Sequence, residues 1–316
     1  MHDERGWPPR PQEPGLENPA SAVTSGRRGP DELSPALIRQ GLCTRFVGQD
    51  VTYLRSVDST NVVAARAASR GAAEGLLVIA EEQTVGRGRL GRRWVSPPGV
   101  GLWFSVVLRP TGLPPAAIGR LLMLTGCAVA QAIERVARLS PWLKWPNDVL
   151  VNGRKVGGLL GQAGLPLPLG GEGRGYSPAQ PGEGGFLAWT VVGVGLNVNA
   201  DEATMQAIAP GASSLLVERG KPVSRVRLLR AILEGLETRY QALRAGEEER
   251  LRREWAARLE TLGQSVAVVT PAGTLEGLAE DVDADGALLL RLPDGRLERL
   301  LAGDVTLRNE LSRIGT

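Results

Sequence analysis

Histidine is almost missing from this chain of 316 residues, and the single example is His2. It stands in an N-terminal stretch rich in proline, glycine and charge, which we predict to be disordered. This argues against a Ser-His-Asp triad, a Cys-His pair and a histidine-ligated metal site. The chemistry must rest on Lys, Arg, Asp, Asn and backbone amides. Such groups suit reactions that need positioning and charge stabilisation more than a general base.

Cysteine is also scarce, because the chain has only Cys43 and Cys127. Their separation fits no zinc or redox spacing, which indicates two reduced thiols in a cytosolic protein. No run of about eighteen apolar residues is present, so no membrane span is expected. The N-terminus lacks the apolar core of a signal peptide. These absences together predict a cytoplasmic protein with no membrane partner.

The chain has little excess charge of either sign. Lys and Arg number 37 against 34 for Asp and Glu, which gives a net charge of +3. This balance argues against a dedicated nucleic-acid-binding protein. Hydrophobic residues make up 42% of the chain, which is enough for a substantial core. The length allows two domains, or one domain with an extension.

Hydrophobic periodicity predicts a mixed α/β region between about residues 51 and 262. The segment before it divides into a disordered tail over residues 1–34 and a short helical turn within 35–49. Predicted strands cover residues 51–54, 76–81, 101–108, 149–151 and 187–196. One predicted helix ends near residue 69, and three others cover residues 116–139, 224–245 and 247–259.

The hydrophobic pattern of the sequence changes at Gly263, which is a plausible domain boundary. Short alternating runs follow, separated by turn residues, and predict a small all-β barrel over 263–316. Residues 35–262 would then form the main domain. Within it, Asn-Gly at 152–153 predicts a tight hairpin turn. Residues 164–185 are rich in Gly and Pro, and we expect a flexible insertion there.

Residues 86–92, with the sequence GRGRLGR, are the most informative segment of the chain. Glycine lets a ligand approach the backbone closely, and arginine offers a charged fork of donors to phosphate or carboxylate. The segment has neither the Walker A pattern nor the Rossmann fingerprint. It suits an anionic ligand that must be covered and then released, but basic Gly/Arg loops also bind nucleic acid.

Other candidates are ambiguous when each is taken alone. Lys155 lies just past the hairpin turn, and strand alternation predicts that it shares a face with Gly157 and Leu159. Spacing alone favours a solvent-facing lysine over one that neutralises a carboxylate or phosphate. Asp148, beside a Trp-Pro corner, suits either a surface ion pair or the orientation of a cation. Gly193 and Gly195, with Asn197 as a polar anchor, fit packing and ligand contact equally well.

Taken together and in order, five segments resemble those of the biotin protein ligases. The likeness covers roughly residues 50–309. Any one motif is weakly specific, but five in register are highly specific, and they favour the functional interpretation of each candidate. The matching segments are DSTN at 58–61, EQT and GRGRLGR at 82–84 and 86–92, KWPND at 144–148, GRKVGG at 153–158 and GVGLNVN at 193–199.

The resemblance implies an α+β fold in which helices flank a mixed sheet. This is the class II synthetase-like catalytic domain of biotin and lipoate ligases, with a small C-terminal SH3-like β-barrel. It also implies a two-step reaction. Biotin and Mg-ATP give biotinyl-5′-adenylate and pyrophosphate, and the adenylate then acylates one lysine of a biotin carboxyl carrier domain. The acceptor lysine belongs to the partner, which is consistent with the missing histidine.

The resemblance also implies where biotin binds. Ser59, Thr60 and Asn61 would hold its ureido ring, with Gln83 beside them. Trp94 would pack against the ligand when the Gly/Arg loop becomes ordered over it.

The reacting centre would lie between the Gly/Arg loop and Lys155. Arg87, Gly88 and Arg89 would hold the carboxylate and adenylate, and Lys155 would contact the reacting carboxyl and α-phosphate oxygens. Lys155 and Arg89 are the predicted catalytic residues. The mixed anhydride is prone to hydrolysis, so a loop that orders over it would keep water out.

A third group would support nucleotide and Mg²⁺ binding, and it comprises Lys144, Asn147, Asp148 and Asn197. No direct protein ligand of a metal is predicted. The family often pairs through its central sheet, so a homodimer is possible.

The sequence departs from the family pattern in three places. Leu90 stands where bacterial members often have arginine, so we expect that position to be dispensable. Residues 164–185 lengthen a connection that is usually short. The residues before the main domain lack the two helices and wing of members that also repress transcription, which predicts a monofunctional, non-repressor protein.

Three other functions compete with this interpretation. A lipoate–protein ligase shares the fold and a catalytic lysine, but the GRGRLGR and KWPND segments favour biotin. A nucleic-acid-binding regulator would use the basic loop, but the net charge and the missing helix-turn-helix oppose it. A catalytically dead biotin sensor is disfavoured because Lys155 is present.

Overall fold

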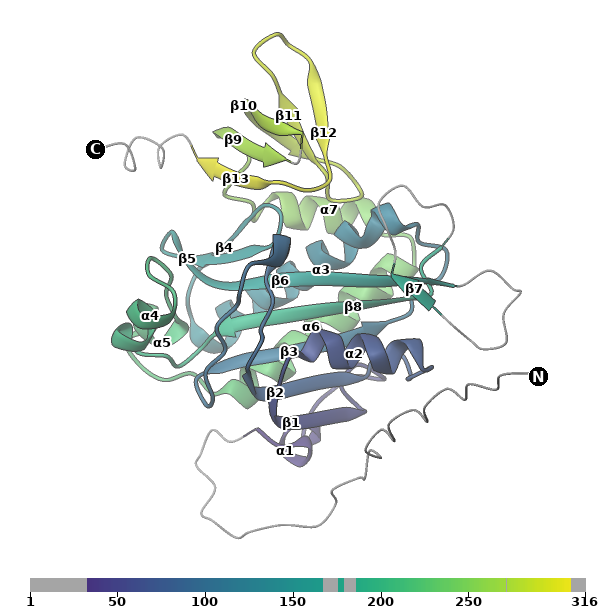
Figure 1. Cartoon of the computed structure of the whole chain (residues 1–316), viewed down its shortest axis with the longest axis vertical. Coiled ribbons are helices and arrows are strands. Elements are labelled where there is room, and N and C mark those ends of the chain that lie inside the picture. Colours follow the sequence, from purple (N-terminus) through teal and green to yellow (C-terminus); the bar gives the residue numbers. More distant parts are fainter. Residues whose placement is uncertain (1–32, 167–175, 179–185, 271, 308–316) are drawn as a thin grey trace, which may run out of the picture. The chain divides into compact units, whose positions relative to one another are not determined.

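The computed structural model describes residues 33–166, 176–178, 186–270 and 272–307. Two sheets carry the fold (Figure 1). The larger has the order β1-β2-β3-β8-β6-β5-β4, with β7 paired to β6. Its β1–β2 pair is parallel and the other pairs are antiparallel, which confirms the mixed sheet. The strands are β1 (Val51–Val57), β2 (Leu77–Gln83), β3 (Gly101–Leu108), β4 (Pro141–Lys144), β5 (Asp148–Val151), β6 (Arg154–Pro166), β7 (Tyr176–Pro178) and β8 (Trp189–Asn197).

Helices cover both faces of this sheet, because its strands alternate buried side chains toward each face. Val78 of β2 packs with the alanines of α2, whereas Ile79 joins the core that contains α3 and α6. The neighbouring strand repeats the pattern with Val107 and Val106. The helices are α1 (Pro35–Arg39), α2 (Thr60–Ser69), α3 (Ile118–Ala132), α4 (Glu202–Ile208), α5 (Leu215–Arg219), α6 (Arg225–Arg244) and α7 (Glu248–Ala256).

The helix that includes α3 is long and apolar enough to cross a membrane, since Pro115–Ala137 has a mean hydropathy of 1.6 over its most apolar window. Two thirds of that window is buried, and α3 packs against α6 and β6. It is therefore a core helix. A single 3-10 turn precedes it, and a π-helical turn ends it at Ala137, just before Arg138 in the left-handed conformation.

A separate five-stranded antiparallel sheet follows and confirms the predicted small C-terminal β domain. Its strand order is β12-β11-β10-β9-β13. The boundary at Gly263 stays a prediction. The strands are β9 (Ser265–Thr270), β10 (Gly273–Val282), β11 (Leu288–Arg291), β12 (Leu297–Leu300) and β13 (Asp304–Leu307).

Two predicted irregular segments are partly ordered. Residues 1–32 lie outside the described part, but Leu33 is fully buried and the Ser34 hydroxyl caps α1, so these two do not belong to a disordered tail. β6 runs to Pro166 and pairs with β7, so residues 164–166 and 176–178 of the expected insertion are strand. Residues 167–175 and 179–185 lie outside the described part. Leu33 and Ser34 differ from the prediction because Leu33 has an apolar side chain and Ser34 is a good N-cap residue.

Candidate active site

A cavity of about 440 Å³ lies where the five motif segments meet, and its lining includes residues of all five. Its volume is typical of a small-molecule site, where the usual range is about 300–1,000 Å³. All twelve predicted site residues line it, although their roles stay predictions. They are Ser59, Thr60, Asn61, Gln83, Arg87, Gly88, Arg89, Lys144, Asn147, Asp148, Lys155 and Asn197.

The N-terminus of α2 forms the polar part of the cavity. Ser59 is the N-cap residue, but its hydroxyl makes no capping hydrogen bond. The Gln83 side chain takes over that task, because its Oε1 accepts from the Thr60 backbone N–H at 2.9 Å. Gln83 Nε2 in turn donates to Ser96 Oγ at 2.9 Å. An uncharged set of donors and acceptors is thus fixed in place before any ligand arrives.

Ser105 of β3 also contacts this network, although it is not among the predicted site residues. It is fully buried, and its Oγ lies 2.8 Å from Thr60 Oγ1 and 2.6 Å from Asn61 Oδ1. Asn61 Nδ2 also donates to the Leu160 carbonyl at 3.2 Å. The available signal was a lone hydroxyl in the apolar strand GLWFSVVL.

Three glycines form a flat wall across the paired strands β6 and β8. Gly158 is paired with Gly195, and Leu160 with Gly193. A Cβ at Gly195 would lie 2.7 Å from Trp94 Nε1, and one at Gly193 would lie 2.0 Å from Asn61 Oδ1. Strand β8 therefore needs glycine at both positions to pack against Trp94 and Asn61, and contact of these glycines with a ligand stays a prediction.

Lys155 does not share a face with Gly157 and Leu159, and that prediction was wrong. The pairing of β5 with β6 shifts register, because Leu150 pairs with Lys155 but Val149 pairs with Gly157. This bulge interrupts the alternation, as an extra residue always does. Lys155 Nζ instead lies 2.6 Å from Asp148 Oδ1, beside Gly158, and 5.6 Å from the centre of the Trp94 ring. The lysine therefore points into the cavity.

The Gly/Arg loop contacts the C-terminal sheet. Arg89 Nη1 donates to Asn147 Oδ1 at 3.3 Å and to the Gly303 carbonyl at 3.2 Å. Arg92 forms an ion pair with Asp304, 212 positions away in the sequence. Burial lowers the pKa of the Arg89 guanidinium, and the Asp304 and Asp148 carboxylates oppose that shift. Both sheets therefore hold the loop over the cavity.

The cavity lining is strongly basic. It includes six cationic side chains, those of Arg87, Arg89, Arg92, Arg93, Lys144 and Lys155, against the carboxylates of Asp148 and Asp304. An anionic ligand would thus be stabilised inside the cavity even though the whole chain is nearly neutral.

The remaining supporting residues make protein contacts at the cavity. Asn147 Nδ2 donates to the Leu159 carbonyl at 2.6 Å, and Asn197 Nδ2 donates to the Ser213 carbonyl at 3.1 Å. Within the described residues, no cluster of three or more His, Cys, Asp or Glu side chains could hold a metal ion.

Comparisons with known proteins agree with this geometry. Residues 53–163 match the biotin/lipoate A/B protein ligase family, and residues 261–308 match the biotin protein ligase C terminal domain. A biotin–[acetyl-CoA-carboxylase] ligase of Mycobacterium tuberculosis is 33% identical, with 87% of this chain and 97% of that one covered. A bifunctional ligase/repressor of Bacillus spizizenii is 32% identical, covering 88% and 80%.

The fold has solved counterparts as well. A biotin protein ligase from Aquifex aeolicus, in complex with biotin and ATP, superimposes with a TM-score of 0.65 and 26% identity. The match covers 82% of this chain and 99% of that one. By sequence, fold and the convergence of its motifs on one cavity, the chain belongs to the biotin protein ligase family.

Proposed function

We propose that this protein activates biotin as biotinyl-5′-adenylate with ATP and transfers the biotinyl group to a lysine of a biotin carboxyl carrier domain. One observation carries the proposal. A single cavity combines a preformed polar site at Ser59–Asn61, a wall of glycines and six basic side chains. Such a site suits a ligand with a polar ring at one end and an anionic reacting centre at the other.

In the first step, a carboxylate oxygen of biotin forms a bond to the α-phosphorus of ATP, and pyrophosphate leaves. Two anions must approach each other, so cations have to offset their repulsion. Lys155 is placed for this, since it enters the cavity beside Asp148. Arg89 on the loop supplies a second charge, and its contact with Asn147 holds it at the cavity.

In the second step, the carrier lysine amine attacks the acyl carbon of the adenylate. The C–N bond forms, AMP leaves with the electron pair, and the amine loses a proton. This chain supplies no nucleophile. Its contribution is to hold the adenylate and exclude water until the carrier arrives, which the contacts of Arg89 and Arg92 with the C-terminal sheet favour.

Mg²⁺ fits this site as part of the nucleotide. Magnesium in nucleotide sites is commonly held by substrate phosphates, water and one or two carboxylates. Asp148 offers a carboxylate in the cavity, next to Asn147 and Lys144. When bound, the ion would neutralise phosphate charge. Removal of Mg²⁺ with a chelator should stop adenylate formation.

Four further expectations belong to this proposal. The acceptor would be a biotin carboxyl carrier domain, and the compartment would be the cytoplasm. No nucleic acid would take part, so tight duplex binding at physiological salt would contradict the proposal. Pairing of two copies through the central sheet stays a prediction, which light scattering would test.

A direct competition between acyl substrates tests the function. The protein would be given ATP and a biotin carrier domain or a lipoyl domain, with either biotin or lipoate. We expect modification of the biotin carrier domain in the biotin reaction alone. Adenylate formation from lipoate, with none from biotin, would assign the protein to the lipoate ligases instead.

A further inference from the structure

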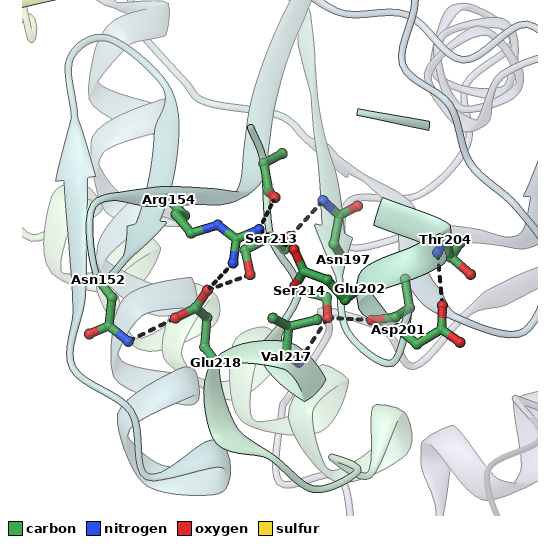
Figure 2. A network of polar contacts seen from close by, with 12 residues as sticks. Asn152, Arg154, Asn197, Asp201, Glu202, Thr204, Ser213, Ser214, Val217 and Glu218 are labelled. Carbon is green, nitrogen blue, oxygen red and sulfur yellow. Dashed lines mark hydrogen bonds and ion pairs between the residues drawn. The ribbon is translucent and has the colours of Figure 1, made fainter. Parts of the chain in front are cut away.

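Arg154 stands next to Lys155 in the GRKVGG segment, yet it has no part in the chemistry described above. Its guanidinium makes three contacts with the segment that follows β8 (Figure 2). Nη2 donates to Glu202 Oε1 and to the Ala212 carbonyl, each at 2.9 Å, and Nη1 lies 3.4 Å from Glu218 Oε1. A planar fork of donors suits several acceptors in fixed directions.

Glu218 lies at the centre of this network. Its side chain is only 7% exposed, although it carries a charge. Besides Arg154, it accepts hydrogen bonds from Asn152 Nδ2 at 2.8 Å and from the Ser213 hydroxyl. A nearly buried carboxylate is stable only when its partners compensate for lost water, so these residues are held as one unit.

The network connects directly to Lys155 and to the cavity. The Ser213 N–H donates to the Lys155 carbonyl at 2.8 Å, and the Ser213 carbonyl accepts from Asn197. The adjacent residues Ile208, Ala209 and Ala212 line the cavity. Residues 208–213 therefore form a wall of the cavity. Arg154 fixes the wall at Ala212, and the backbone of Lys155 fixes it at Ser213.

This wall lies away from the polar site at α2. Gly193 contacts Asn61, whereas Asn197 contacts the wall, and both belong to β8. Four residues of strand span about 13 Å, at roughly 3.3 Å each. In the proposed function, the nucleotide would therefore contact the wall of residues 208–213, and the biotin ring would bind at the other end of the cavity.

We propose that Arg154 and Glu218 are positioning residues for adenylate formation, which fix the wall of residues 208–213 and the strand of Lys155 relative to each other. Neither side chain touches the reacting atoms. Their loss should raise the KM for ATP and lower kcat, and leave the KM for biotin unchanged. This inference rests on the proposed ligase function.

The test measures biotin-dependent exchange of pyrophosphate into ATP by the full chain. Glu218→Gln and Arg154→Gln should each raise the KM for ATP and lower kcat by about tenfold, with the KM for biotin within about twofold of the original. Arg154→Lys should restore only part of the loss, because an ammonium cannot reach three separate acceptors. The double variant should be little worse than either single variant, since both break one unit.

Glu202→Gln is the matched control. Glu202 is 61% exposed and lies at the edge of the network, so its loss should change each parameter by less than about twofold. Thermal melting and titration of active sites correct for any unfolded fraction. If Glu218→Gln fails to fold, Arg154→Lys carries the test alone.

Three results would overturn the proposal. The first is unchanged kinetics in both network variants, and the second is a loss of activity explained wholly by the unfolded fraction. The third is an equal effect on the KM for biotin. Absence of exchange in the unsubstituted chain would overturn the ligase function as well, so the two failures are distinguishable.

Discussion

Gly193 and Asn61 are so close that only a hydrogen atom fits on the Cα of residue 193. A Cβ there would lie 2.0 Å from Asn61 Oδ1 and 2.8 Å from its Cγ. Asn61 is also held by Ser105 and by the Leu160 carbonyl. The glycine is thus part of what places the asparagine amide in the cavity.

Gly193→Ala should therefore displace Asn61 and weaken biotin binding by about tenfold or more, because an anchored polar group would lose its alignment. Isothermal titration calorimetry with biotin alone measures this directly. Binding as tight as that of the unsubstituted protein would show that Asn61 does not contact biotin.

Ser105→Ala should weaken biotin binding indirectly. It removes a buried hydroxyl that contacts both Thr60 and Asn61, and one such hydrogen bond is worth about 1 kcal/mol. We expect a loss of about fivefold in affinity. Thr190→Val is a matched control, since the Thr190 hydroxyl is buried without a partner in the described structure. If the two variants bind biotin equally well, Ser105 does not position the site.

Arg89→Gly should loosen the retention of the adenylate. It removes the contacts of the loop with Asn147 and Gly303 and leaves the fold of both domains intact. The released intermediate would react with lysines of bystander proteins. Incubation with ATP, biotin and serum albumin, followed by avidin blotting, checks this. Labelling that stays confined to the carrier domain would show that Arg89 does not retain the intermediate.

The two cysteines should differ sharply in reactivity. Burial raises the pKa of the Cys127 thiol to about 12, with the Glu254 carboxylate adding to the shift, whereas Cys43 is exposed. Only the thiolate reacts, and a raised pKa keeps it scarce until the pH approaches 12. At pH 8, mass spectrometry should find one alkylated thiol in the folded protein and two after denaturation. Labelling that persists in Cys43→Ser would contradict this difference.

Much of the main domain was predictable from local pattern. The strand at Gly101–Leu108 is a nearly continuous apolar run, and the helix at Ile118–Ala132 is long and periodic, so hydrophobicity alone places both. The environment of Lys155 was not predictable. A bulge depends on the pairing of two strands, and strict alternation within one strand contains no sign of it.

The candidate site likewise has features that the local sequence predicts and features that it does not. Its glycine and arginine motifs are local and were found, whereas partners from distant parts of the chain were missed. Asp304 holds Arg92 from a different sheet, and Glu218 holds Arg154 from a separate helix. A single charged residue on a polar surface looks ordinary in the sequence. Only the fold shows which opposite charge it meets.

The most direct test follows adenylate formation by mass spectrometry, with ATP, biotin and Mg²⁺ but no carrier domain. We expect biotinyl-5′-adenylate with release of pyrophosphate, and a loss on the order of 10²–10³ in rate for Lys155→Ala, as for removal of one such electrostatic contact. Lys155→Arg keeps the charge and should retain more activity. Near-normal pyrophosphate release by Lys155→Ala would contradict the central role given to this lysine.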